Sequence, residues 1–172
     1  SGMFDYNVLA EDFSNIFSNC SSLTSIPANL FDNNPLVTSF ERAFGGTGIT
    51  AIPANLFDFN TAVYNDSSDT WGCFYATFSN CSSLTAIPAN LFDNNVIANS
   101  FALTFQNTGI TTVPADLFIN NVDVTNFRYL FESCASLSTI PSGLFDTNIL
   151  VEDFQDIFSN TALTTIPANL FD

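Results

Sequence analysis

The residues of this chain that could carry general acid–base chemistry are mainly carboxylates. Its 172 residues include 17 Asp and Glu, two Arg, no Lys and no His, which gives a formal net charge of −15. The usual general bases, Schiff-base amines and imidazole metal ligands are therefore absent. A carboxylate pair could still hydrolyse a glycoside, but most acids recur at turn positions such as Asp32, Asp58, Asp93 and Asp146. A structural role is the simpler interpretation, so we expect no enzyme activity and no cofactor.

Oxygen ligands for calcium are plentiful in this sequence. The runs Asp32-Asn33-Asn34 and Asp93-Asn94-Asn95 could supply them, as could Asp66 and Asp69. None of these matches a twelve-residue calcium loop or a glycine-rich nonapeptide repeat. Because Asp and Asn also form turns without any metal, we expect no metal site and leave calcium binding open.

One stretch combines aromatic side chains with carboxylates, a mixture suited to a sugar or to a protein hot spot. It is TAVYNDSSDTWG, residues 61–72, and it holds the only Trp of the chain. The candidate ligand-binding residues in and beside it are Tyr64, Asp66, Asp69, Trp71 and Tyr75. The alternative is that Trp71 folds back onto the core and the stretch is a tolerated bulge.

The charge of the chain excludes several classes of partner. A chain with net charge −15 cannot neutralise a phosphate backbone, which excludes nucleic acid, and it is repelled by anionic lipid surfaces. No apolar run approaches the roughly 20 residues that span a bilayer, so we expect no membrane insertion. The charge keeps a Phe-rich chain soluble and favours a secreted or cell-surface location. We take the sequence as a fragment of a longer protein.

The elements that must position these residues are repeats. A segment close to LTAIPANLFD, which begins at Leu84, occurs six times, and its prolines are Pro27, Pro53, Pro88, Pro114, Pro141 and Pro167. Their spacing is nearly constant except between Pro53 and Pro88. That interval contains an insertion, since Phe57 and Phe74 are eight positions further apart than the equivalent pair Phe92 and Phe101. A fixed period of this length predicts a solenoid whose coils stack on one another.

A second signature lies between the prolines, a pair of phenylalanines four residues apart, as in Phe40 and Phe44. Four residues is one helical turn, so this spacing predicts that each pair shares a helical face. Polar residues that could cap the exposed amides stand just before the pairs: Asp12, Ser39, Ser100, Asn126 and Asp153.

Each coil is therefore predicted to consist of a strand, a helical turn, a second strand and a second helical turn. We expect an α/β solenoid of about six coils, each roughly 26–27 residues long, with short parallel strands, short helical turns and one insertion at about 61–72. Residues 1–172 would form a single domain. Thr85 and Thr111 would belong to an exposed row along the strands.

Three of the four cysteines, Cys20, Cys81 and Cys134, occupy one repeat position in every second coil. If coils stack at about 4.8 Å, these cysteines are on the order of 10 Å apart, beyond the roughly 7 Å limit for a disulfide. We expect them to be buried thiols that behave as small hydrophobic groups. Cys73 lies outside this pattern and could be free or paired.

The run FSNCSSLTAIP, residues 78–88, with an aromatic pair upstream, resembles the BspA-like leucine-rich repeats of bacterial surface proteins. The resemblance covers nearly the whole chain except the insertion. It implies a right-handed, curved solenoid and a role in adhesion, with an extracellular protein or glycan as the partner. The arrays also resemble parts of phage proteins, and that resemblance implies a part of a receptor-binding protein. A different hypothesis is structural: the apolar ends of the array could associate end to end as a filament or spacer.

Overall fold

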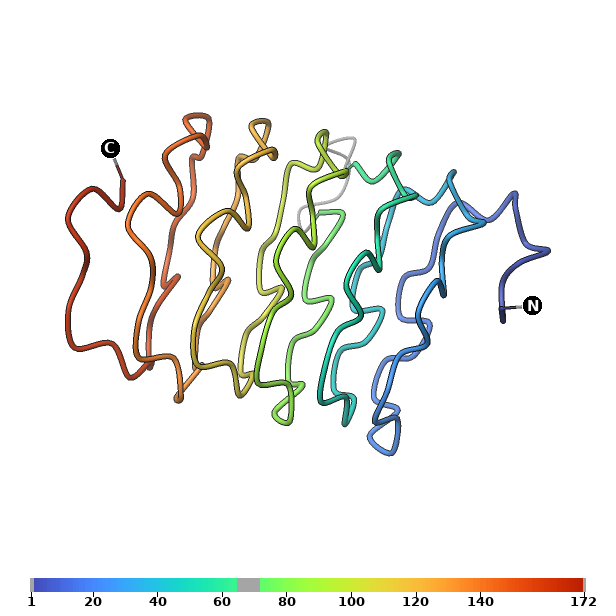
Figure 1. Ribbon diagram of the computed structural model, residues 1–172, viewed down its shortest axis with the longest axis horizontal. Coiled ribbons are helices and arrows are strands. Elements are labelled where there is room, and N and C mark those ends of the chain that lie inside the picture. The colour runs from blue at the N-terminus through green and yellow to red at the C-terminus, as the bar shows by residue number, and fades with distance from the viewer. Residues whose placement is uncertain (1, 65–71, 172) are drawn as a thin grey trace.

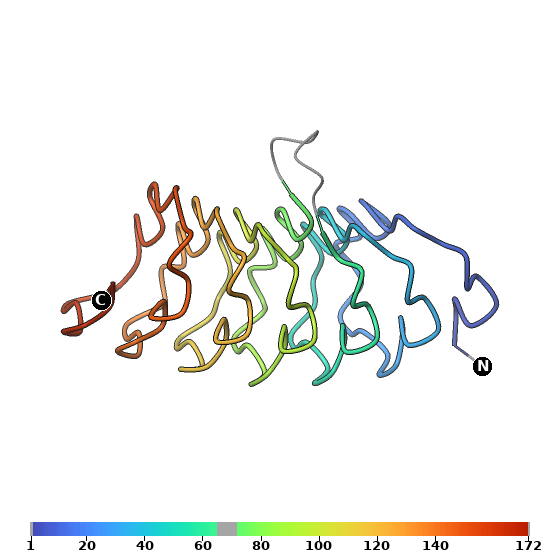
Figure 2. The same cartoon turned by 90° about the horizontal axis from the view of Figure 1, so that it is seen from above.

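The computed structural model, which describes residues 2–64 and 72–171, is a stack of coils (Figure 1). The chain advances along one axis from the blue N-terminal coil to the red C-terminal coil, and each coil lies beside the next. Seen from above, the stack is arched, with the coils closer together on one side than on the other (Figure 2). The prediction of a curved solenoid is confirmed, and its right-handedness stays a prediction.

Regular secondary structure is nearly absent from the described residues. None of them lies in a helix or in an extended strand, and turns make up most of each coil. Isolated parallel bridges join Asp12 to Ser39, Ser100 to Asn126, and Asn126 to Asp153. These bridges stand where short parallel strands were expected, and β-turns stand where helical turns were expected.

The turns between the paired phenylalanines alternate two kinds of hydrogen bond. In the second coil, the amide of Ala43 closes a local turn on the carbonyl of Phe40 at 3.0 Å. The amides of Phe40, Arg42 and Phe44 instead donate to carbonyls of the next coil at 2.8–2.9 Å. Every second amide therefore leaves its own coil, and a helix, in which all amides bond within the segment, cannot form.

The backbone conformation that permits this alternation has a positive φ two residues after the first phenylalanine of each pair. A residue with positive φ cannot continue a right-handed helix. The position recurs in every coil with φ between 49° and 60°, at Asn15, Arg42, Ala76, Leu103, Tyr129 and Asp156.

The predicted caps are present, although they cap turns. The side chain of Asp12 accepts a hydrogen bond from the amide of Ser14 at 2.7 Å, and that of Asn126 accepts one from Arg128 at 2.9 Å. Ser39, Ser100 and Asp153 accept equivalent bonds from the amides two residues later. Each cap satisfies an amide that the sharp turn would otherwise leave unpaired.

Three columns of phenylalanine rings run through the core, packed among buried Leu, Ile and Val side chains. One column holds the Phe of each Leu-Phe motif, with ring centroids 6.0–6.3 Å apart from Phe31 to Phe145. The other two hold the first and second members of the pairs, and rings of the first two columns approach to 4.7 Å, as between Phe92 and Phe101. Phe59 is 55% exposed and stands outside the columns. Burial of these rings supplies most of the apolar driving force.

A ladder of buried asparagines runs beside the first column, and the sequence interpretation missed it. Asn95 donates from Nδ2 to the carbonyls of Phe57 at 3.2 Å and Asn60 at 2.9 Å, both in the preceding coil. Asn34, Asn60, Asn121 and Asn148 make the same two bonds. Their Oδ1 atoms have no hydrogen-bond partner among the described residues. The ladder ties each coil to its neighbour at the turn after the Leu-Phe motif.

The prediction for the cysteines is confirmed at two positions and wrong at a third. Cys81 and Cys134 are buried, and their Sγ atoms lie 3.3 Å from the hydroxyls of Thr47 and Thr108 in the preceding coil. Cys20 is exposed because it belongs to the first coil, so no earlier coil covers it. All four cysteines, Cys73 included, are free thiols.

These positions predict selective thiol reactivity. Burial raises the pKa of the Cys73, Cys81 and Cys134 thiols, which lowers their thiolate fraction and blocks access. In a titration with a disulfide reagent at pH 8, we expect Cys20 alone to react rapidly in the native protein and all four thiols to react in denaturant. Two or more rapidly reacting native thiols would contradict the packing of the alternate coils.

Candidate functional site

The structure describes two of the five predicted ligand-binding residues, Tyr64 and Tyr75. Asp66, Asp69 and Trp71 lie outside the described residues. Tyr64 is 46% exposed, and its amide donates to the carbonyl of Thr38 at 3.1 Å. Tyr75 is only 6% exposed. The binding role assigned to these five residues stays a prediction.

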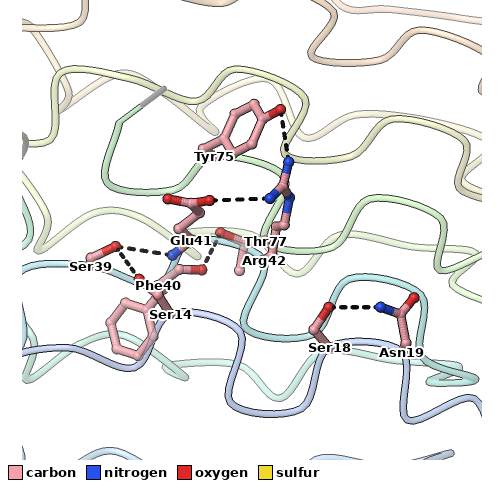
Figure 3. A network of polar contacts seen from close by, with 9 residues as sticks. All are labelled: Ser14, Ser18, Asn19, Ser39, Phe40, Glu41, Arg42, Tyr75 and Thr77. Atoms are coloured by element: carbon pink, nitrogen blue, oxygen red, sulfur yellow. Dashed lines mark hydrogen bonds and ion pairs between the residues drawn. The ribbon is translucent and has the colours of Figure 1, made fainter. Parts of the chain in front are cut away.

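Tyr75 is held by Arg42, one of the two cationic side chains of the protein (Figure 3). The Arg42 guanidinium lies 4.9 Å from the centroid of the Tyr75 ring and donates to its hydroxyl at 3.3 Å. Arg42 also forms an ion pair with Glu41 at 3.5 Å. The cation covers the ring that the sequence interpretation offered to a ligand, as expected of a cation–π pair.

A small polar hollow of about 140 Å³ lies beside Arg42. Gly45 and Gly46 line it together with Ser18, Asn19, Ser79 and Asn80. Gly46 has φ +72°, and a Cβ there would lie 2.7 Å from the Oδ1 atom of Asn19, so a larger residue would be strained and would displace the Asn19 side chain. The hollow is smaller than most ligand pockets, whose volumes begin at about 300 Å³. Its glycines are explained by the packing of adjacent coils.

A repeated set of exposed apolar side chains forms an apolar ridge along the stack. We define this apolar ridge as the large apolar residues at the two positions that follow each ladder asparagine or Asn7, the equivalent residue of the first coil. Its members are Val8, Leu9, Leu36, Val96, Ile97, Val122, Ile149 and Leu150, which are 39–84% exposed. The next apolar residue of the coil, such as Val37 or Val124, turns inward and is fully buried. The ridge therefore recurs after five of the six asparagines, and Thr61 and Ala62, which follow Asn60, interrupt it.

An acidic row runs along the same turn of every coil except that of Phe118, where Ile119 takes the place of the aspartate. We define the acidic row as Asp5, Asp32, Asp58, Asp93 and Asp146, each of which directly follows a column phenylalanine. Partial burial, and then repulsion from Asp58 and Asp5, raise the pKa of Asp32. The pKa of Asp93 is raised by partial burial and by Asp116 and Asp58. In both cases repulsion from carboxylates of neighbouring coils is the second cause, after burial.

This repulsion predicts that the free energy of unfolding depends on pH and that the substitution Asp58→Asn weakens the dependence. A folded-state pKa above the unfolded value means that protonation favours the folded state. The free energy of unfolding should therefore fall as the pH rises from 3.8, the ordinary value, through the folded pKa values of Asp32 and Asp93. We expect Asp58→Asn to lower both pKa values in carboxyl ¹³C NMR titrations and to flatten this fall. Unchanged titrations in the variant would contradict coupling along the row.

The strand-like part of each coil carries a second exposed row, as predicted. Thr85 and Thr111 are both exposed, and the amide of Thr50 donates to the carbonyl of Thr24 in the preceding coil at 3.3 Å. This threonine row is polar, in contrast to the apolar ridge.

The described residues form neither a metal-ligand group nor a membrane-spanning helix. Within residues 2–64 and 72–171, no three His, Cys, Asp or Glu side chains are grouped as metal ligands would be. The same residues contain no helix with the length and apolar character needed to span a membrane.

Comparison with known proteins gives a fold likeness and no family. No family model matches the chain, and no curated protein matches it. Among solved structures, the leucine-rich repeat domain of APL1B aligns with 69% of the chain at 14% identity and a TM-score of 0.46. The structure of the Toll–Spätzle complex from Drosophila aligns with 98% of the chain at 20% identity and a TM-score of 0.46.

The chain covers 33% and 26% of the length of these two structures. Likeness at this level does not assign a family or a function. The description of the chain as a solenoid therefore rests on its own stacked coils, phenylalanine columns and asparagine ladder. The BspA-like resemblance stays an expectation, because no family model supports it.

Proposed function

We propose that this chain is a non-catalytic protein-binding solenoid that uses the apolar ridge as its binding surface. The observation that carries the proposal is the position of the exposed large apolar side chains. Eight of the fifteen found among the described residues belong to the ridge, although the chain has many other surface positions. A repeated, aligned set of exposed apolar residues marks an interaction surface, whereas singly scattered ones need no explanation.

The energetics support the proposal. Full burial of a Val, Leu or Ile side chain stabilises a complex by about 1.5–3 kcal/mol. The ridge side chains are roughly half exposed, so a partner that covers them would gain part of this burial free energy from each one. Leu9, Leu150 and Ile149, at opposite ends of the stack, are all more than half exposed. A partner that lies along the axis would contact several coils at once.

The alternatives are less well supported by geometry. The threonine row is polar and offers few apolar anchors, although it could contact a glycan. The Arg42 hollow is small. We propose an extracellular or cell-surface setting, because a charge of −15 keeps a chain with an exposed apolar surface soluble.

Selection from a displayed library of random twelve-residue peptides tests the proposal without a known ligand. The ridge variant L36S/I97S/L150S replaces three exposed side chains, and the control variant T85A/T111A/T164A replaces three exposed threonines of the other row. Circular dichroism and urea denaturation establish that both variants fold. We expect peptides selected on the unmodified protein to bind the ridge variant at least tenfold more weakly and the control variant equally well. Peptides that bind the ridge variant with full affinity would overturn the proposal.

A further inference from the structure

We infer that the partner of the apolar ridge is a cationic amphipathic protein segment, with apolar side chains that cover the ridge and Lys or Arg side chains that face the acidic row. The inference rests on the proposed function and adds the chemical class of the partner. Its basis is the juxtaposition of the two rows on one turn, which occurs in four of the coils. Asp32 precedes Leu36 by four residues, and Asp93 precedes Val96 and Ile97 by three and four.

The acidic row has no cation of its own to balance it. The protein has two cationic side chains, and both are engaged elsewhere. Arg42 pairs with Glu41 and Tyr75, and Arg128 lies over Tyr129 and 3.9 Å from Asp153. A partner with Lys or Arg would supply the missing charge.

Partial burial raises the pKa values of Asp32 and Asp93, and repulsion from carboxylates of neighbouring coils, Asp58 among them, adds to the effect. A partner cation placed between successive coils would replace this repulsion with attraction. Binding should therefore lower both pKa values. The effect requires no rearrangement of the coils, because the asparagine ladder already fixes their spacing.

Other occupants fit the surface less well. A second copy of the chain would bring its own net charge of −15 against the acidic row. An anionic lipid surface would be repelled in the same way. A neutral apolar segment would cover the ridge but leave the row uncompensated. A cationic amphipathic segment offers both interactions. Its apolar contacts give affinity, and its complementary charge gives specificity and a faster association rate.

The spacing of the coils suits a segment that runs along the axis. Rings of the first phenylalanine column, in the same turn region, repeat every 6.0–6.3 Å. Side chains on one face of an extended chain repeat every 6.6–6.8 Å, about twice the rise per residue, and one turn of a helix rises about 5.4 Å. Either conformation would place one anchor over each coil for several coils.

The test uses the peptides selected on the unmodified protein and two variants with equal charge change. The row variant D32N/D58N/D93N removes three successive carboxylates of the acidic row. The control variant E41Q/E132Q/D156N removes three from the other half of the coil. Both retain the ridge, and Asn replaces Asp at turn positions that Asn tolerates well. Unfolding curves establish that both variants are folded.

We expect the selected peptides to be rich in Lys and Arg alternating with apolar residues. By isothermal titration calorimetry, their affinity should fall at least tenfold in the row variant and less than twofold in the control. Carboxyl ¹³C NMR should show that binding lowers the pKa values of Asp32 and Asp93. Equal losses in both variants would overturn the inference, because they would indicate attraction to the net charge alone.

The two proposals fail in distinguishable ways. Peptides that need the ridge but bind the row variant with full affinity would overturn the cationic partner and leave the protein-binding ridge intact. Peptides that bind the ridge variant with full affinity would overturn both, since the surface itself would then be wrong.

Discussion

Replacing Phe92 by alanine is expected to lower the free energy of unfolding by about 3–5 kcal/mol, the cost of removing a buried aromatic side chain and leaving a cavity. Phe92 is fully buried and contacts rings of the two neighbouring coils and of its own. It stacks on Phe57 at 6.0 Å and on Phe118 at 6.1 Å, and it lies 4.7 Å from Phe101. Because each coil is stabilised by its neighbours, the loss in a central coil weakens both contacts. Urea denaturation, monitored by circular dichroism, measures the change in the free energy of unfolding.

Phe59 provides the matched control, since it is the same residue type in the same repeat array but stands outside the columns and is exposed. Phe59→Ala should change the free energy of unfolding by less than about 0.5 kcal/mol, as for most surface substitutions. Equal effects of the two substitutions would contradict the assignment of the phenylalanine columns as the core.

Asn95→Leu is expected to have the second largest effect, a loss of about 2–4 kcal/mol in the free energy of unfolding. Leucine has a similar size but no donor, so the buried carbonyls of Phe57 and Asn60 lose their partners. Each unsatisfied buried group costs about 1–3 kcal/mol. The unpartnered Oδ1 of Asn95 is removed at the same time, which offsets part of the cost.

The neighbouring Asn94 is exposed and serves as the control. Asn94→Leu should leave the free energy of unfolding nearly unchanged in the same urea denaturation experiment. If Asn95→Leu proved as stable as the unmodified protein, the ladder would contribute nothing to the stacking of coils.

Much of the fold could be predicted from the spacing of a few residue types. The regular intervals between the prolines and the recurring phenylalanine pairs identify stacked coils with a phenylalanine core, because a coil that exposes such residues must bury them on a neighbour. Handedness could not be read from spacing, because it depends on how successive turns are connected.

The local structure was harder to predict, and the pair Phe40 and Phe44 shows why. A separation of four residues fits one helical turn, but it also fits two successive turns with a positive φ at Arg42 between them. The choice depends on whether alternate amides bond to the next coil, and tertiary hydrogen bonds of this kind override local spacing. Arg, Leu and Tyr at these positions gave no local sign of positive φ.

The ladder and the ridge did leave a signal in the sequence. The third residue after each column phenylalanine is always Asn, as at Asn34, Asn95 and Asn148, whereas the residue before it varies among Tyr, Asn, Phe and Thr. An unvarying polar residue within a varying turn indicates burial with a fixed hydrogen-bond role. The interpretation of Asp-Asn-Asn as an ordinary turn hid this difference, and with it the two apolar positions that follow.

The central claim is that the ridge binds a partner, and methyl NMR measures it most directly. In protein labelled at the Ile, Leu, Val and Thr methyl groups, a selected peptide should shift the signals of Leu36, Ile97, Val122 and Leu150. The buried Leu91 and Ile110 serve as internal references and should shift little. Shifts confined to Thr85, Thr111 and the other residues of the threonine row, with the ridge methyl signals unmoved, would contradict the account.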